Sequence, residues 1–217
     1  MKSKPAIQIN LNNLDVYFLI DKSGSMSRRV GELPRGVVNE SPQDTRLTRY
    51  KYCEETIIPF ATQLAAYDDD GVTLAFFNRE FTLMDNVKNL DIAGLFTAQN
   101  PGGGTALAAP LTEVLNLATN RCGEKQQFIV VMTDGEPDSQ SAVMDAIVNA
   151  TKKIKENGKV CILFLQVGDD AGAAKFLATL DSGLERYGAV IDMVAVKHID
   201  AIAGRPLVDV VTEAFNN

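Results

Sequence analysis

Short apolar runs alternate along the chain with longer segments of helical periodicity. The apolar runs are rich in β-branched and aromatic residues and are bounded by turn-forming residues, a pattern typical of β-strands. Two of them, at 128–132 and 160–167, show no polar alternation, so we expect central strands that helices cover on both faces. The strands predicted in this way are 14–20, 71–77, 80–84, 128–132, 160–167 and 190–196.

The intervening segments place apolar residues at the i, i+3, i+4, i+7 positions of an amphipathic helix, and one such stripe is Val143, Ile147, Ala150 and Ile154. Pro59 should kink or break the first of these helices. Only Asn78 and Arg79 separate the second and third strands, which predicts a hairpin and one antiparallel strand at the sheet edge. The order β-α-β-β-α-α-β-α-β-α-β-α predicts an α/β, doubly wound, Rossmann-like fold. We expect a mainly parallel sheet with helices on both faces.

One polar segment, residues 27–46, departs from this pattern. It lies between the first strand and the first helix and contains two glycines and two prolines, so we expect a surface excursion from a core of about 14–215. Its arginines are either a solvated surface or a rim that receives an acidic partner. They are Arg28, Arg29, Arg35 and Arg46.

Composition narrows the class of protein. The chain has 217 residues with 46% hydrophobic and 23% charged residues, as in ordinary globular proteins. Its formal net charge of −7 argues against nucleic-acid and anionic-membrane partners. No apolar segment approaches the ~20 residues of a membrane span, and polar residues interrupt the N-terminal region too early for a secretory signal. The three cysteines are widely spaced without a CxxC pair, so we expect a reduced, cytoplasmic protein.

Oxygen-bearing side chains follow the first strand directly, in the sequence Asp21-Lys22-Ser23-Gly24-Ser25. Ligands of open α/β folds bind outside the carboxyl ends of the strands. Residues 21, 23 and 25 alternate and can turn three oxygens toward one point, which suits the hard-oxygen preference of Mg²⁺. The same residue types also suit a turn with a helix cap, so this loop alone leaves both interpretations open.

Two further segments add oxygens at the same predicted edge. Asp134 follows the strand at 128–132, and Thr105 ends the sequence GGGT, whose glycines permit a close approach of backbone. Either segment alone could be a helix cap or a flexible loop. Together the three loops predict a divalent metal site, with Mg²⁺ preferred and Mn²⁺ or Ca²⁺ as alternatives. Its ligands are Asp21, Ser23, Ser25, Thr105 and Asp134.

The composite pattern D-x-S-x-S … T … D resembles the metal-ion-dependent adhesion site (MIDAS) of von Willebrand factor type A (VWA) domains, the fold shared with integrin inserted domains. All five residues match it, and the resemblance implies a single VWA domain over residues 1–217. The segments LIDKSGSM and VVMTDGEP resemble the bacterial cytoplasmic branch. In simple VWA domains the first helix starts soon after the last motif serine, so the excursion at 27–46 is a departure from the family.

The charge of the site indicates its role. Two carboxylates and three neutral hydroxyls leave a divalent ion electrophilic, so it favours an anionic oxygen from outside. The resemblance implies the same, because VWA domains usually bind a Glu or Asp carboxylate of a protein ligand. We therefore predict a metal-dependent protein–protein interaction module without enzymatic activity. A stress-response system is among the settings that bacterial relatives imply, beside tellurite-resistance, chelatase and phosphorylation systems.

The alternative is a Mg²⁺-dependent hydrolase or phosphotransferase that uses the same metal site. The sequence contains no GxxxxGK[ST] or GxSxG motif, and the first loop lacks the second aspartate of a DxDx[TV] nucleophile motif. The sole histidine, His198, follows the last strand and is expected on the surface. Glu136 and Asp138 either point toward the site or cap the following helix, and we expect the cap.

Overall fold

One twisted sheet organises the computed structural model, which describes residues 6–31, 37–39, 41–67 and 70–217. The strand order is β3-β2-β1-β4-β5-β6, and all neighbours are parallel except β2 and β3 at one edge. The predicted fold class is confirmed. The strands are β1 (Leu14–Asp21), β2 (Val72–Phe77), β3 (Phe81–Val87), β4 (Gln126–Thr133), β5 (Val160–Gln166) and β6 (Val194–His198).

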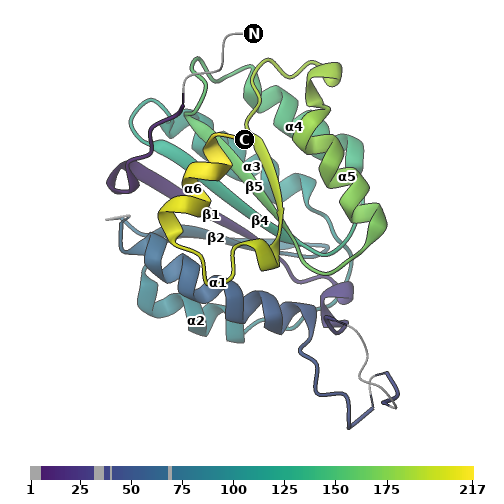
Figure 1. Cartoon of the computed structure of the whole chain (residues 1–217). Helices are drawn as coiled ribbons and strands as arrows, with labels where there is room; N and C mark the ends of the chain where they lie inside the picture. The colour runs from purple at the N-terminus through teal and green to yellow at the C-terminus, as the bar shows by residue number, and fades with distance from the viewer. Residues whose placement is uncertain (1–5, 32–36, 40, 68–69) are drawn as a thin grey trace.

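Helices cover both faces of the sheet and give three layers (Figure 1). α1, α2 and α6 lie on one face, and α3, α4 and α5 lie on the other. No helix among the described residues combines the length and apolar character needed to cross a membrane. The helices are α1 (Arg49–Ala65), α2 (Asn89–Thr97), α3 (Ala108–Arg121), α4 (Gln140–Thr151), α5 (Ala171–Ser182) and α6 (Leu207–Phe215).

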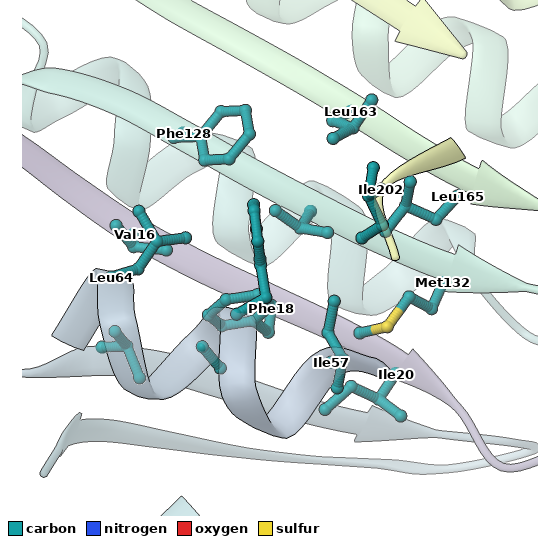
Figure 2. Packing of buried hydrophobic residues seen from close by; sticks show 14 of the residues in the cluster. Val16, Phe18, Ile20, Ile57, Leu64, Phe128, Met132, Leu163, Leu165 and Ile202 are labelled. Carbon is teal, nitrogen blue, oxygen red and sulfur yellow. The ribbon is translucent and has the colours of Figure 1, made fainter. Parts of the chain in front are cut away.

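Alternation along the central strands divides the core in two. Phe18 of β1 and Phe128 of β4 pack with Ile57 of α1 on one face (Figure 2). Tyr17 and Leu19 of β1 point to the opposite face and pack with α3 and α4. Each fully buried apolar side chain stabilises the fold by about 1.5–3 kcal/mol relative to exposure. The two cores therefore fix the sheet from both sides and define the edge at which its strands end.

Three local predictions differ from the structure. α1 continues through Pro59 without a break, because its buried stripe packs on the sheet on either side of the proline. α4 ends at Thr151, so Ile154 lies outside the helix. The last strand begins at Val194, four residues later than the apolar pattern suggests. The backbone N–H of Val190 donates to the Thr151 hydroxyl at 3.2 Å, and Val190 is exposed.

The described parts of the excursion at 27–46, residues 27–31, 37–39 and 41–46, lie beyond the end of β1, and those before α1 extend away from the body of the fold (Figure 1). Most of its described residues are exposed or half-buried, as predicted, but Asp44 is 4% exposed. Asp44 pairs with Arg46 at 2.7 Å and with Arg29 at 3.5 Å. These two arginines therefore hold the segment together rather than forming a rim. Residues 32–36 and 40, with Arg35, lie outside the described residues.

Candidate metal centre

The parallel neighbours β1 and β4 end side by side and bring two loops to one edge. Ile20 is in register with Met132, which sets Asp21 beside Thr133. The Thr133 hydroxyl donates to Asp21 Oδ2 at 2.8 Å. Asp134 follows directly, so the topology places both carboxylates at the carboxyl edge of the sheet, where ligands of such folds bind.

The first loop folds back on itself after Asp21. The Ser23 backbone N–H donates to Asp21 Oδ1 at 2.7 Å, and the chain then enters a 3₁₀ turn over Gly24–Ser27. The Ser23 and Ser25 hydroxyls lie 3.0 Å apart, and the Ser25 hydroxyl donates to Asp134 Oδ1 at 2.7 Å. Asp21, Ser23 and Asp134 are each at most 1% exposed. One continuous, largely buried chain of hydrogen bonds thus links four of the five predicted residues.

The glycine-rich loop lies against the first loop through its backbone. Gly24 N–H donates to the Gly103 carbonyl at 3.0 Å, and Gly102 N–H donates to the Lys22 carbonyl at 2.8 Å. Gly103 has φ +86°, a conformation that favours glycine. These bonds bring Thr105, 8% exposed, to the same edge. Within the described chain no hydrogen bond of the Thr105 hydroxyl is formed, so its oxygen is available to a ligand.

Asp138 does not cap α4, contrary to prediction. Ser139 is the cap, since its hydroxyl accepts from the Ala142 N–H at 3.3 Å. Asp138 Oδ1 instead accepts from the Thr105 N–H at 3.0 Å, and the Asp138 N–H donates to the Thr105 carbonyl at 2.9 Å. Glu136 does not cap the helix either, because its carboxylate accepts from the Gln140 side chain. Asp138 therefore ties the third loop to the second.

Arg49 is a component of the site that sequence reasoning missed. It is the first residue of α1, and its Nη1 donates to Asp134 Oδ2 at 2.7 Å. Its side chain is 14% exposed. An arginine at the start of an amphipathic helix is ordinarily solvated, and nothing in the sequence links it to an aspartate 85 positions away. The structure thus adds a fixed positive charge to a site predicted to contain only acidic and neutral groups.

The two carboxylates differ in their electrostatic surroundings. Burial raises the pKa of Asp21 to about 6, opposed by hydrogen bonds from Ser23 and Thr133 and reinforced by the charge of Asp134. Asp134 has Arg49 as a partner, whereas no basic side chain in the described chain forms an ion pair with Asp21. A buried carboxylate without a compensating cation is costly. The oxygens around Asp21 therefore fit a cation that would offset this charge.

The donor set also constrains which cation fits. Within the part of the chain that the structure describes, no three His, Cys, Asp or Glu residues gather as metal ligands. A metal at this edge would have to use the hydroxyls of Ser23, Ser25 and Thr105 beside the two carboxylates. Hydroxyl and carboxylate oxygens suit hard ions such as Mg²⁺ and Mn²⁺.

Comparison with known proteins agrees with this architecture. A family model described as the von Willebrand factor type A domain matches residues 15–187. The fold is similar to manganese-loaded TRAP protein from Plasmodium vivax, with a TM-score of 0.54 over 89% of this chain and 71% of that chain at 18% identity. It is also similar to the pilus adhesin SpaC from Lactobacillus rhamnosus GG, with a TM-score of 0.58 over 96% of this chain at 14% identity.

The coverage and the sequence identity of these matches determine what they show. This chain spans only 31% of the SpaC chain, and at such low identities the two structures show the fold alone. No curated protein matches the chain. The three loops that carry Asp21, Thr105 and Asp134 lie within the residues that the family model matches.

Proposed function

We propose a function from the premise that the chain belongs to the von Willebrand factor type A domain family. The protein is a metal-dependent protein–protein interaction module that binds a Glu or Asp side chain of its partner through a MIDAS. The observation that carries this proposal is Asp21, a fully buried carboxylate with no ion-pair partner in the described chain, at the head of a chain of serine hydroxyls.

The residues that would hold the ion are Asp21, Ser23, Ser25, Thr105 and Asp134. When bound, a divalent ion supplies a Lewis-acidic centre that attracts an anionic oxygen. We favour Mg²⁺, with Mn²⁺ or Ca²⁺ as alternatives, and the manganese-loaded state of the Plasmodium vivax neighbour supports a divalent ion in this fold. The side chains themselves contribute orientation, because the serine hydroxyls and Asp134 are already hydrogen-bonded to one another at 2.7–3.0 Å.

Several features support interaction rather than chemistry. The pilus adhesin among the structural neighbours is a binding protein by its name, although the chain spans only part of it. The sole histidine, His198, is 35% exposed at the end of β6, and its Nδ1 accepts from the Asp200 N–H at 3.3 Å. It contacts none of the five oxygen donors, so the hydrolase alternative has no histidine base beside Ser23 or Ser25. We propose a single-domain, non-enzymatic protein of the bacterial cytoplasm that acts in a stress-response system.

The test combines metal binding with partner capture. Titration calorimetry with Mg²⁺ and Mn²⁺ should give binding by the native chain and none by Asp21→Ala. Asp209→Ala removes an exposed carboxylate of α6 and serves as the matched control. Immobilised protein should capture partners with Mg²⁺ and lose them with EDTA or with Asp21→Ala. Equal metal binding by Asp21→Ala, or capture that survives both treatments, would refute the proposal.

A further inference from the structure

We propose that Arg49 is a built-in counter-charge that weakens metal binding until the carboxylate of a partner joins the site. It does so by neutralising Asp134, so that metal and partner bind cooperatively. This inference rests on the proposed metal site and concerns a residue outside the five-residue adhesion pattern.

The two oxygens of Asp134 have different partners. Oδ1 accepts from the Ser25 hydroxyl at 2.7 Å, and Oδ2 accepts from Arg49 Nη1 at 2.7 Å. The guanidinium of Arg49 thus cancels most of the charge of the carboxylate, and Oδ1 keeps its own hydrogen bond with Ser25. Asp134 is 1% exposed, so this ion pair is poorly screened by solvent. Its effect on a neighbouring cation is therefore larger than that of a surface arginine.

The position of Arg49 is fixed by more than this one contact. Its backbone N–H donates to the Arg28 carbonyl at 2.7 Å. Gly168, with φ +77°, passes so close that a Cβ there would lie 2.9 Å from Arg49 Nε. Within the described chain, that buried Nε has no hydrogen-bond partner. The guanidinium is therefore packed against the backbone after β5 and directed at Asp134.

Helix stability does not account for an arginine here. The N-terminus of a helix carries a partial positive charge, so acidic residues are favoured in the first turn and basic ones are disfavoured. The first turn of α1 contains no acidic residue and opens with Arg49. The arrangement costs stability at the helix and gains an ion pair at the sheet edge, which indicates that the charge serves the site.

The balance of charges gives the functional consequence. Asp21 and Asp134 bring two negative charges and Arg49 one positive charge, so the site carries one net negative charge. A divalent ion would leave it with one positive charge, and one carboxylate from a partner would make it neutral. Without Arg49 the loaded site would already be neutral. Metal would then bind more tightly alone, and the partner's carboxylate would gain less.

Calorimetry of Mn²⁺ binding tests this role, with and without saturating acetate as the carboxylate probe at constant ionic strength. Four chains are compared: the native chain, Arg49→Gln, Arg49→Lys and Arg186→Gln. Arg186 is exposed in the turn at Leu184–Tyr187 after α5, so its substitution removes the same charge outside the site.

We expect Arg49→Gln to bind Mn²⁺ alone about tenfold more tightly, the size expected for one poorly screened unit charge. Acetate should tighten Mn²⁺ binding less in Arg49→Gln than in the native chain. Coupling between two ligands is reciprocal, so a carboxylate that gains less from the bound metal also strengthens metal binding less. Arg49→Lys and Arg186→Gln should behave as the native chain does.

The outcomes separate the two proposals. If the native chain binds no Mn²⁺, both the metal site and the role of Arg49 are wrong. If it binds Mn²⁺ but folded Arg49→Gln binds it equally or more weakly, or couples equally to acetate, only the role of Arg49 is wrong. If Arg49→Lys behaves like Arg49→Gln, geometry rather than charge is responsible, and the proposal also fails. Circular dichroism of each variant verifies the fold.

Discussion

Thr105 and Asp138 hold each other by two hydrogen bonds that run in opposite directions. The Thr105 N–H donates to Asp138 Oδ1 at 3.0 Å, and the Asp138 N–H donates to the Thr105 carbonyl at 2.9 Å. A Cβ at Gly104 would lie only 3.0 Å from Asp138 Oδ2, so the two loops meet closely. This clamp fixes the second loop, which would supply a metal ligand, to the third loop, which would supply another.

Asp138→Ala should lower Mg²⁺ affinity by about 10–100-fold, the usual cost of losing a residue that orients a ligand. The Thr105 N–H would lose its acceptor, so the loop that carries the Thr105 hydroxyl would no longer be held at the site. Titration calorimetry measures the effect. Glu136→Ala is the matched control, because Glu136 lies in the same loop but contacts Gln140. Native affinity in Asp138→Ala would show that the clamp does not position Thr105.

Mg²⁺ should raise the melting temperature of the native chain. A ligand at 100 times its Kd stabilises the folded state by about 2.7 kcal/mol. For a chain of 217 residues this corresponds to a shift of roughly 5–10 °C. Asp21→Asn should abolish the shift, and without metal it should be no less stable than the native chain, because it removes a buried charge. A full Mg²⁺ shift in Asp21→Asn, measured by calorimetric scanning, would place the ion elsewhere.

Gly168→Ala should destabilise the protein more than Gly204→Ala. Both glycines have positive φ, +77° and +67°, and a non-glycine residue in this conformation costs about 1–2 kcal/mol. A Cβ at Gly168 would also lie 2.9 Å from Arg49 Nε, whereas a Cβ at Gly204 would meet nothing within 4 Å. Urea unfolding gives the difference. Equal losses would mean that Arg49 can move away from Gly168 at no cost.

The fold was predictable because its signals are local. The uninterrupted apolar runs form β4 and β5, and the short Asn78–Arg79 connection joins β2 to the antiparallel edge strand β3. The whole order of strands and helices follows from such patterns. The strand predicted at 190 begins later because an apolar residue such as Val190 can be exposed while its backbone bonds a side chain.

In the candidate site, only the residues that belong to a spaced motif or follow a strand end could be predicted. Asp21, Ser23 and Ser25 are close in sequence, and strand ends located Asp134. Gly24 contributes to the site through its backbone. A Cβ there would be 3.5 Å from the Gly103 carbonyl, an ordinary contact, and the Gly24 N–H donates to that carbonyl.

Arg49 and Asp138 could not be predicted, because their roles arise from tertiary contacts. Arg49 reaches an aspartate 85 residues away, and Asp138 binds a backbone N–H 33 residues away. A basic residue is disfavoured at the start of a helix, but this does not identify the partner of Arg49, and an aspartate is common in a loop. The parallel register of β1 and β4 places the loops after these strands side by side, and backbone hydrogen bonds hold the glycine-rich loop and the start of α1 against the first loop.

Glu213 of α6 should titrate with a pKa of about 2, lowered chiefly by its hydrogen bond with Arg205 and then by that with Lys197 of β6. The folded pKa lies below the unfolded value, so this contact stabilises the fold above about pH 4.5 and loses its contribution as the pH falls toward 2. Arg205→Gln should raise the pKa of Glu213 toward 4.5, because it removes the largest cause while the Lys197 contact remains. Carboxyl NMR titration measures the change directly.

The control is Arg186→Gln. Arg186 is an exposed arginine in the turn at Leu184–Tyr187, so its substitution removes the same net charge and should leave the pKa of Glu213 unchanged. An equal response in both variants would mean that long-range charge, rather than the Arg205 contact, lowers the pKa.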